Sequence, residues 1–321
     1  MTSYNELKNN ILEYAYQQKI PVSGEFELTG NCNFACEMCY AKTFEKSLSK
    51  ENWIKIFDMA QKAGLLYALL TGGEIFTHPD FIFLYEYLYD LGVKITLYTN
   101  GSLLSEEILA CLKKRPPEMV AITLYGYDKE SYKEFTKVNS FTMIDKTIDL
   151  LRKEKINLAL RTIPLPSIYK NLDKVIAYAK SKNLHLGYFL YVSKVRNNEL
   201  TRLSPKELID FEKRIKKAFK LKPSSHKAKC GAFRNGYFIN HLGYMQGCPM
   251  MANPSKKIED DFLSTWLYLK EEWMDLLRKS PCSTCELNNS CMTCLARRHL
   301  EGNIFKCSSY LKEIAEEKEN A

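Results

Sequence analysis

Apolar and polar residues follow two alternating patterns along the first two thirds of the chain. Runs rich in β-branched, aromatic and leucine residues predict strands, at 24–30, 66–71, 93–98, 119–125, 156–163 and 185–192. Between them, apolar residues recur at intervals of three and four, which predicts helices over 50–63, 103–114, 142–154 and 171–182. The strict alternation of six strand–helix units indicates a parallel sheet with right-handed crossovers. Because a closed barrel of this kind has eight units, we expect an α/β fold with a partial (β/α)6 barrel of the TIM type.

The pattern changes after the sixth predicted strand. Residues 204–219 predict one more helix, with Ser204 as its N-cap. The stretch KLKPSSH at 220–226 is typical of a linker. Beyond it the chain has short strand patterns, turns and cysteines, and 233–246 alternates as expected for a hairpin that turns near 241–243.

This change of pattern predicts two domains, a barrel over 1–225 and a small cysteine-rich domain over 226–321. No run approaches the roughly 18 uninterrupted apolar residues that a membrane helix needs. The N-terminus also lacks the basic start and apolar core of a secretory signal, so we expect a cytoplasmic location and no membrane association. The net charge of +8 comes from scattered lysines, which indicates a solvated basic surface rather than nucleic-acid binding.

The eleven cysteines are the most informative part of the composition. Thiols are kept reduced in the cytoplasm, so clustered cysteines there indicate metal binding rather than disulfides. Ten of them fall in two clusters, which are Cys32, Cys36 and Cys39, and then Cys230, Cys248, Cys282, Cys285, Cys291, Cys294 and Cys307. Cys111 stands apart within a helical pattern, where we expect a small core residue.

The first cysteine cluster has the spacing CxxxCxxC and follows the first predicted strand, at the catalytic end of parallel α/β barrels. Three thiolates on one tight loop can hold three corners of a [4Fe–4S] cluster, which leaves the fourth iron free to bind another molecule. Zinc is the alternative, but a structural zinc site needs four ligands and no histidine lies nearby. Gly72, Gly73 and Glu74 follow the second strand, where glycines let a ligand approach the backbone and a carboxylate can accept from an ammonium group.

These residues resemble the radical S-adenosylmethionine (radical SAM) superfamily over about residues 24 to 225. The CxxxCxxC loop is the signature of that superfamily, and GGE after the second strand is its usual partner. The resemblance implies one [4Fe–4S] cluster on the loop cysteines, with the amino and carboxylate groups of S-adenosyl-L-methionine on its fourth iron. It also implies cofactor contacts from Met38, Gly72, Gly73, Glu74, Thr99, Asn100, Thr123 and Arg161.

The resemblance gives these positions separate roles. Glu74 and the two glycines would hold the amino group of the cofactor, and Arg161 would pair with its carboxylate. The third predicted strand is followed by the sequence Thr-Asn-Gly at residues 99–101. Relatives often carry the same three residues at this place, near the cofactor. Thr123 stands where relatives use a hydroxyl, although ordinary strand packing is the alternative for it and for Arg161. Met38 departs from the family pattern, because many relatives carry an aromatic residue there to flank the adenine.

The second cysteine cluster has seven thiols, which is three more than one four-ligand site needs, so it predicts two metal centres. Two zinc ribbons are the alternative. This cysteine cluster resembles the SPASM extension of radical SAM enzymes, which carries two auxiliary iron–sulfur clusters. By that resemblance one [4Fe–4S] cluster is ligated by Cys282, Cys285, Cys291 and Cys307, and the other by Cys230, Cys248 and Cys294. One departure from the pattern is that one residue fewer than usual separates Cys291 from Cys294.

The auxiliary cluster with three cysteines lacks a fourth thiolate. Fully ligated relatives add a cysteine a few residues before Cys230, where this chain has KPSSHKAK. Two possibilities stay open: the fourth iron binds a substrate thiolate or water, or it has an unusual ligand such as His226.

The stretch ITLYGYDKESYKEFTKVNSF looks like the maturases of ribosomally made peptides, which install thioether or carbon–carbon crosslinks or invert residues. Sulfatase-activating relatives typically carry an acidic residue right after the second SPASM cysteine, and Pro249 at that position disfavours them. We therefore expect an oxidoreductase that cleaves S-adenosylmethionine and modifies a peptide or protein. We expect reduced flavodoxin or ferredoxin as its electron donor.

About 24 residues precede the first strand, so we expect the leader of such a peptide to bind elsewhere or through a separate protein. One alternative function is radical chemistry on a small cofactor precursor. Another is a zinc-stabilised module that binds nucleic acid or protein through the basic surface. The sequence assigns no catalytic acid, base or hydrogen donor.

Overall fold

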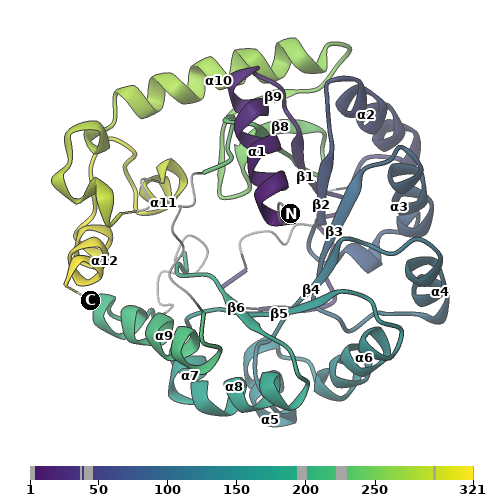
Figure 1. The fold of residues 1–321 in the computed structure, drawn as a ribbon, viewed down its shortest axis with the longest axis vertical. Helices are drawn as coiled ribbons and strands as arrows, with labels where there is room; N and C mark the ends of the chain where they lie inside the picture. The colour runs from purple at the N-terminus through teal and green to yellow at the C-terminus, as the bar shows by residue number, and fades with distance from the viewer. Residues whose placement is uncertain are drawn as a thin grey trace.

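The computed structural model describes residues 4–36, 38–39, 46–193, 201–221, 230–291 and 294–320. Their backbone is built around a nine-stranded sheet with the order β6-β5-β4-β3-β2-β1-β7-β8-β9. The strands are β1 (Ser23–Glu27), β2 (Tyr67–Thr71), β3 (Lys94–Thr99), β4 (Met119–Thr123), β5 (Leu158–Thr162), β6 (Leu186–Tyr188), β7 (Gly236–Ile239), β8 (Tyr244–Cys248) and β9 (Met251–Lys257). Figure 1 shows the sheet curving around the centre of the molecule, with helices on its outer side.

The first six strands confirm the predicted partial barrel. β1 to β6 pair in sequence order, and each pair is parallel. Each strand lies within its predicted run or extends one residue beyond it. Parallel strands of this kind need crossover connections, and the helices that provide them cover the outside of the sheet.

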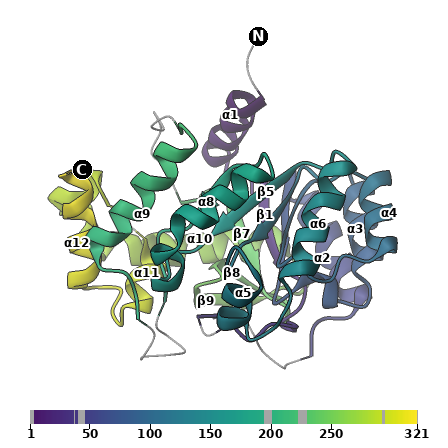
Figure 2. The ribbon, with the colours of Figure 1, turned by 90° about the horizontal axis from the view of Figure 1, so that it is seen from below.

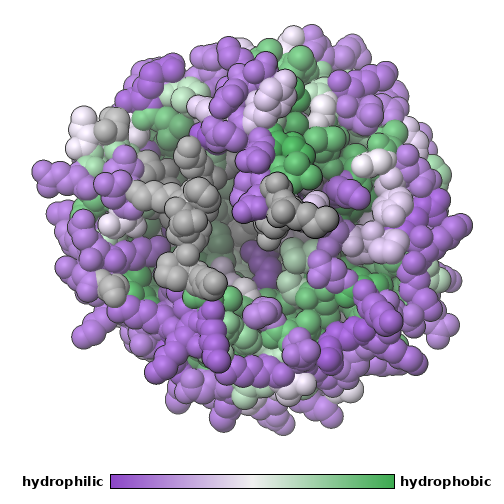
Figure 3. Space-filling view, viewed as in Figure 1, coloured by the Kyte–Doolittle hydropathy of each residue, from purple (hydrophilic) through white to green (hydrophobic). Residues whose placement is uncertain are grey.

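The helices expected between the strands are present as α2 (Lys50–Lys62), α4 (Glu106–Lys114), α6 (Phe141–Lys153) and α8 (Leu172–Ser181). The others are α1 (Tyr4–Gln17), α3 (Phe81–Asp90), α5 (Lys129–Thr136), α7 (Pro166–Lys170), α9 (Pro205–Ala218), α10 (Phe262–Arg278), α11 (Leu295–Leu300) and α12 (Ser309–Glu319), with short 3-10 turns η1 (Ile75–Thr77), η2 (Pro281–Thr284) and η3 (Glu286–Asn289). Ser204 caps α9 as expected, because its hydroxyl accepts from the Glu207 N–H in a capping box. Figure 3 shows a largely hydrophilic rim where the outer helices lie.

The expected hairpin is present, and it continues the barrel sheet. β7 and β8 pair antiparallel, and β9 adds antiparallel to β8. On its other edge β7 pairs parallel with β1, where Phe26 lies opposite Ile239. The sheet is therefore continuous across the position where the sequence predicts a boundary between domains, and the boundary itself stays a prediction.

Phe26 of β1 joins the two parts of this sheet through a shared core. Its ring lies edge-on to Phe57 of α2, with centroids 5.2 Å apart, and edge-on to Tyr237 of β7 at 5.9 Å. All three side chains are buried, and so is Cys111 on α4, as expected for a core residue. Because one strand carries both contacts, the hairpin is held against the barrel by ordinary hydrophobic packing.

Helix α1 lies at the amino-terminal edge of the sheet. Lys8 Nζ is 2.7 Å from Glu118 Oε1, just before β4, and Asn235 Nδ2, just before β7, donates to the Leu12 carbonyl at 2.9 Å. Figure 2 shows α1 standing on this edge of the molecule. The carboxyl ends of the strands are therefore left for a site. Among the described helices, none is long and apolar enough to cross a membrane.

Candidate functional site

A cavity of about 470 Å³ lies at the carboxyl ends of the strands. The first cysteine cluster and seven of the eight expected cofactor contacts line it, namely Cys32, Cys36, Cys39, Met38, Gly72, Gly73, Thr99, Asn100, Thr123 and Arg161. Its size suits a small-molecule ligand. Glu74 is the one expected contact that does not line the cavity.

The three loop cysteines share one wall of this cavity around Tyr125. Burial raises the pKa of Tyr125 well above its usual value, and the thiols of Cys36, Cys39 and Cys32 raise it further. All three thiols therefore lie near one phenol. A set of soft thiols on one wall suits an iron–sulfur cluster, with the remaining cavity free for a ligand on the fourth iron.

Gly72 and Gly73 support the start of the cysteine loop. The Gly73 N–H donates to the Thr29 carbonyl at 2.7 Å, and the Glu74 N–H donates to the Asn31 carbonyl at 2.8 Å. A Cβ at Gly72 would lie 2.6 Å from the Thr29 carbonyl oxygen, and one at Gly73 would overlap the Asn31 carbonyl oxygen. The sequence predicted close approach of a ligand here, and the structure shows close approach of the chain's own backbone.

Glu74 lies beneath the cavity wall, with 1% of its surface exposed. Its Oε1 accepts from the Thr99 hydroxyl at 2.6 Å and from the Phe76 N–H at 3.2 Å, and its Oε2 accepts from the Asn100 N–H at 2.6 Å. Burial raises the pKa of this carboxyl, and the three hydrogen bonds lower it. The carboxylate therefore ties the end of β2 to the end of β3, and its contact with a cofactor amino group stays a prediction.

Asn100 extends this network to the cysteine loop. Its Nδ2 donates to Asn33 Oδ1 at 2.9 Å and lies 4.0 Å from Cys32 Sγ. Asn33 Nδ2 in turn donates to the Ser102 hydroxyl at 2.8 Å. The TNG segment thus holds the loop that carries the first thiol, while Thr99 and Asn100 also face the cavity.

Arg161 lines the cavity together with Tyr98 and Glu25, two residues that the sequence analysis did not single out. Arg161 lies 4.2 Å from the centre of the Tyr98 ring in a cation–π contact. Burial raises the pKa of Glu25 to about 7, although the positive charge of Arg161 lowers it. Glu25 had one signal in the sequence, because it is a carboxylate inside the apolar strand run GEFELTG.

The second cysteine cluster reaches the same cavity through Cys248, which lines it together with Pro249 and Met250. Burial raises the pKa of Cys248 to about 12, and Cys294, Glu25 and Cys230 raise it further by their negative charge. Cys248 therefore lies near the other two thiols of its expected set and near the one acidic side chain that lines the described wall.

Cys307 has a different group of neighbours. Burial raises the pKa of this thiol, and so do the thiols of Cys291, Cys282 and Cys285, whereas Arg298 lowers it. Cys294 also lines a small cavity together with Cys282, Cys291 and Cys307. The division of the seven thiols into sets of three and four, and their ligation, therefore stay predictions from the family resemblance. The described residues contain no group of three cysteine, histidine or acidic side chains gathered tightly enough for a single metal ion. His226 lies outside the described residues.

Comparison with known proteins finds a family match over the residues that build this site. Residues 26–179 match the model of the radical SAM superfamily. The chain is 35% identical over 137 residues to the antilisterial bacteriocin subtilosin biosynthesis protein AlbA of Bacillus subtilis, covering 41% of this chain and 31% of AlbA. It is 28% identical over 267 residues to a probable GTP 3′,8-cyclase of Sulfurisphaera tokodaii, covering 78% and 82% of the two chains.

A solved structure supports the fold. The crystal structure of Streptococcus suis SuiB bound to S-adenosylmethionine superposes with a TM-score of 0.74 at 17% sequence identity. The match covers 96% of this chain and 82% of SuiB. At that identity the likeness shows a shared fold, in which a partial barrel is followed by a cysteine-rich region.

Proposed function

We propose that this protein is a radical SAM enzyme, since residues 26–179 match that superfamily, and that it modifies a peptide or protein substrate with the help of two auxiliary iron–sulfur clusters. Cys32, Cys36 and Cys39 would hold the catalytic [4Fe–4S] cluster. A cluster bound there would supply the electron for reductive cleavage of S-adenosylmethionine, and with it the radical chemistry that removes a hydrogen atom from the substrate. The modification would be a crosslink, a thioether or an inversion of a residue.

The observation that carries this proposal is the shared wall of the cavity. Cys36 reaches it from the barrel loop, and Cys248 reaches it from the hairpin. A substrate in the cavity would therefore lie between the catalytic cluster and an auxiliary cluster. An oxidation needs such an arrangement, because hydrogen leaves the substrate on one side and an electron leaves on the other.

Several residues would orient the two ligands within the cavity. Arg161 offers a cation for the carboxylate of S-adenosylmethionine, and Met38, Thr99, Asn100 and Thr123 line the remaining wall. Glu25 lines the same cavity as Arg161 and Cys248, so its carboxyl would meet the substrate.

The peptide substrate is supported by two similar proteins. AlbA is a bacteriocin biosynthesis protein, and SuiB is also known in a structure bound to precursor peptide SuiA. The match spans about a third of the length of AlbA. A separate leader-binding protein is part of the proposal. We also propose reduced flavodoxin or ferredoxin as electron donor and a cytoplasmic location.

A small-molecule substrate is the second candidate. It is supported by the similarity to the probable GTP 3′,8-cyclase, which extends over most of both chains. The third function weighed from the sequence, a zinc-stabilised binding module, is not retained, because residues 26–179 match the radical SAM superfamily.

Anaerobically reconstituted protein with dithionite and S-adenosylmethionine separates the two candidates. We would add either GTP or a panel of cysteine-rich and aromatic-rich peptides, and measure 5′-deoxyadenosine and the mass of each substrate. The proposal predicts that at least one peptide increases 5′-deoxyadenosine release and is itself changed in mass or stereochemistry. Turnover with GTP and with none of the peptides would contradict it.

A further inference from the structure

Helix α11 carries a buried arginine whose charge is unmatched. Arg298 is 2% exposed, and none of its three guanidinium nitrogens has a hydrogen-bond partner among the residues that the structure describes. Arginine stays protonated in proteins, and a buried charge without partners costs several kcal/mol. The mature protein must therefore place an anion against Arg298.

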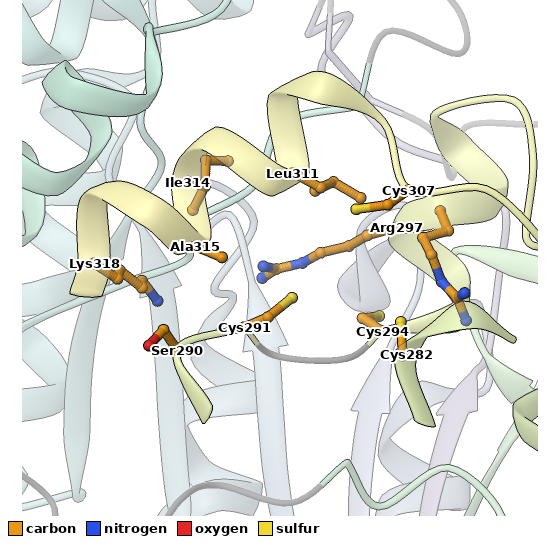
Figure 4. Close-up of a pocket in the computed structure, with 11 residues that line it drawn as sticks. Cys282, Ser290, Cys291, Cys294, Arg297, Cys307, Leu311, Ile314, Ala315 and Lys318 are labelled. Carbon is orange, nitrogen blue, oxygen red and sulfur yellow. The ribbon is translucent and has the colours of Figure 1, made fainter. Parts of the chain in front are cut away.

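The cavity beside Arg298 indicates what that anion is. Its wall includes Cys282, Cys291, Cys294 and Cys307, and Figure 4 shows these side chains around the same space. Arg297, Arg298 and Lys318 also line it, and no carboxylate does so among the described residues. A space with several thiols, several cations and no acid suits a metal centre whose thiolates give it a net negative charge.

Arg298 is tied to one particular set of thiols. Of the four thiols that line its cavity, Cys282, Cys291 and Cys307 belong to the expected four-cysteine set, and Cys294 is the one thiol of the other set. Arg297, the preceding residue, lines the same cavity. Arg297 also lies 5.4 Å from the ring centre of Phe189, which lines the large cavity. Arg297 thus has an aromatic contact beside the large cavity, whereas the guanidinium of Arg298 has no hydrogen-bond partner among the described residues.

We propose that Arg298 donates hydrogen bonds to sulfur atoms of the auxiliary cluster held by Cys282, Cys285, Cys291 and Cys307, and thereby raises its reduction potential. The inference rests on the proposed function, because it requires that cluster. Reduction adds a negative charge, and a buried cation with several N–H donors stabilises the reduced form more than the oxidised form. This auxiliary cluster becomes the better electron acceptor as a result.

The test is a redox titration followed by electron paramagnetic resonance on reconstituted wild type and Arg298→Met, which removes the donors and keeps a similar length. We expect unchanged iron content and a lower potential for one auxiliary signal. The expected change is tenfold or more in the equilibrium constant for reduction, about 59 mV for one electron. Arg278→Met is the matched control, because it removes the same charge from an exposed side chain of α10 and should leave all potentials unchanged.

Each outcome decides a different claim. Full iron content with unchanged potentials in Arg298→Met overturns this inference and leaves the proposed function standing. Wild type with only about four irons contradicts the auxiliary clusters themselves, and with them the proposed function. Wild type that binds zinc instead of iron at these cysteines would likewise contradict the auxiliary clusters and the proposed function.

If the Arg298→Met variant fails to hold the cluster, a measurement on the wild-type protein still tests the proposal. Electron–nuclear double resonance on protein labelled with ¹⁵N-arginine should show a guanidinium coupling to the reduced auxiliary cluster. Arg298→Lys should assemble the cluster and lose that coupling. Absence of any arginine coupling in the wild type would overturn the proposal.

Discussion

Glu74 is the residue at which the family pattern and the observed contacts differ most. Its buried carboxylate accepts from Thr99, Phe76 and Asn100, so it organises the strand ends around the cysteine loop. Glu74→Gln keeps the shape but turns one acceptor into a donor that faces the Asn100 N–H. We expect a loss of roughly 1.5–3 kcal/mol in unfolding free energy, the usual contribution of a charged hydrogen bond.

Calorimetry, iron analysis and cofactor titration together decide what Glu74 does. A supporting role predicts lower thermal stability and less iron, with Glu134→Gln on an exposed face of α5 unchanged as a control. If Glu74→Gln keeps its stability and iron but binds S-adenosylmethionine weakly, the carboxylate is a direct cofactor contact instead.

Glu25 makes stability depend on pH. Burial raises its pKa from 4.5 to about 7, so the folded protein binds a proton more tightly than the unfolded chain. That stabilisation is complete below pH 4.5 and is lost as pH rises through about 7, by up to about 3 kcal/mol. Between pH 5 and 8 the melting temperature of cofactor-free wild type should therefore fall more than that of Glu25→Gln. Parallel pH curves for the two proteins would contradict this.

For single residues, the sequence predicts which side chains come together at the cavity, but it does not predict which atoms they contact there. Strand position indicated Gly72 and Gly73, the family resemblance indicated Thr99 and Asn100, and each lines the cavity. Two of the three partners of Glu74 lie 25 and 26 residues further along the chain, and no local pattern encodes such a contact.

Among the elements, the turn after β2 positions the cysteine loop. Gly73 has no room for a side chain because the loop backbone at Asn31 crosses directly against it. Gly73→Ala should therefore displace the loop, at a cost of roughly 1–3 kcal/mol, which is typical of overpacking. The measurements are the melting temperature and the iron content.

Gly187→Ala on β6 is the matched control. A Cβ there would meet its nearest neighbour at 3.5 Å, which is an ordinary contact. Equal effects of the two substitutions would mean that close packing against the loop is not what Gly73 provides.

The strands of the barrel were predictable because each has its own apolar run. The hairpin was also predictable, from its alternation and its turn. The pairing of β7 with β1 was not, because it joins Ser23 to Gly236 over more than two hundred residues and depends on shared burial rather than on a local pattern. That pairing is what brings Cys248 to the cavity.

At the scale of the whole molecule, two sets of thiols should bind metal independently. The family resemblance assigns Cys248 and Cys282 to different sets. Cys248→Ala and Cys282→Ala should each lose about four irons, and the double variant about eight, since each cluster holds about four. Iron and sulfide analysis measures this. Loss of all auxiliary iron in either single variant would mean that the two sets form one cooperative unit.

The most direct test of the account combines metal content and chemistry in one anaerobic preparation. Wild type should hold about twelve irons and release 5′-deoxyadenosine from S-adenosylmethionine under dithionite. The variant in which Cys32, Cys36 and Cys39 are all replaced by Ala should retain about eight irons and release none. A wild type that binds zinc instead of iron, or a triple variant that still cleaves S-adenosylmethionine, would contradict the account.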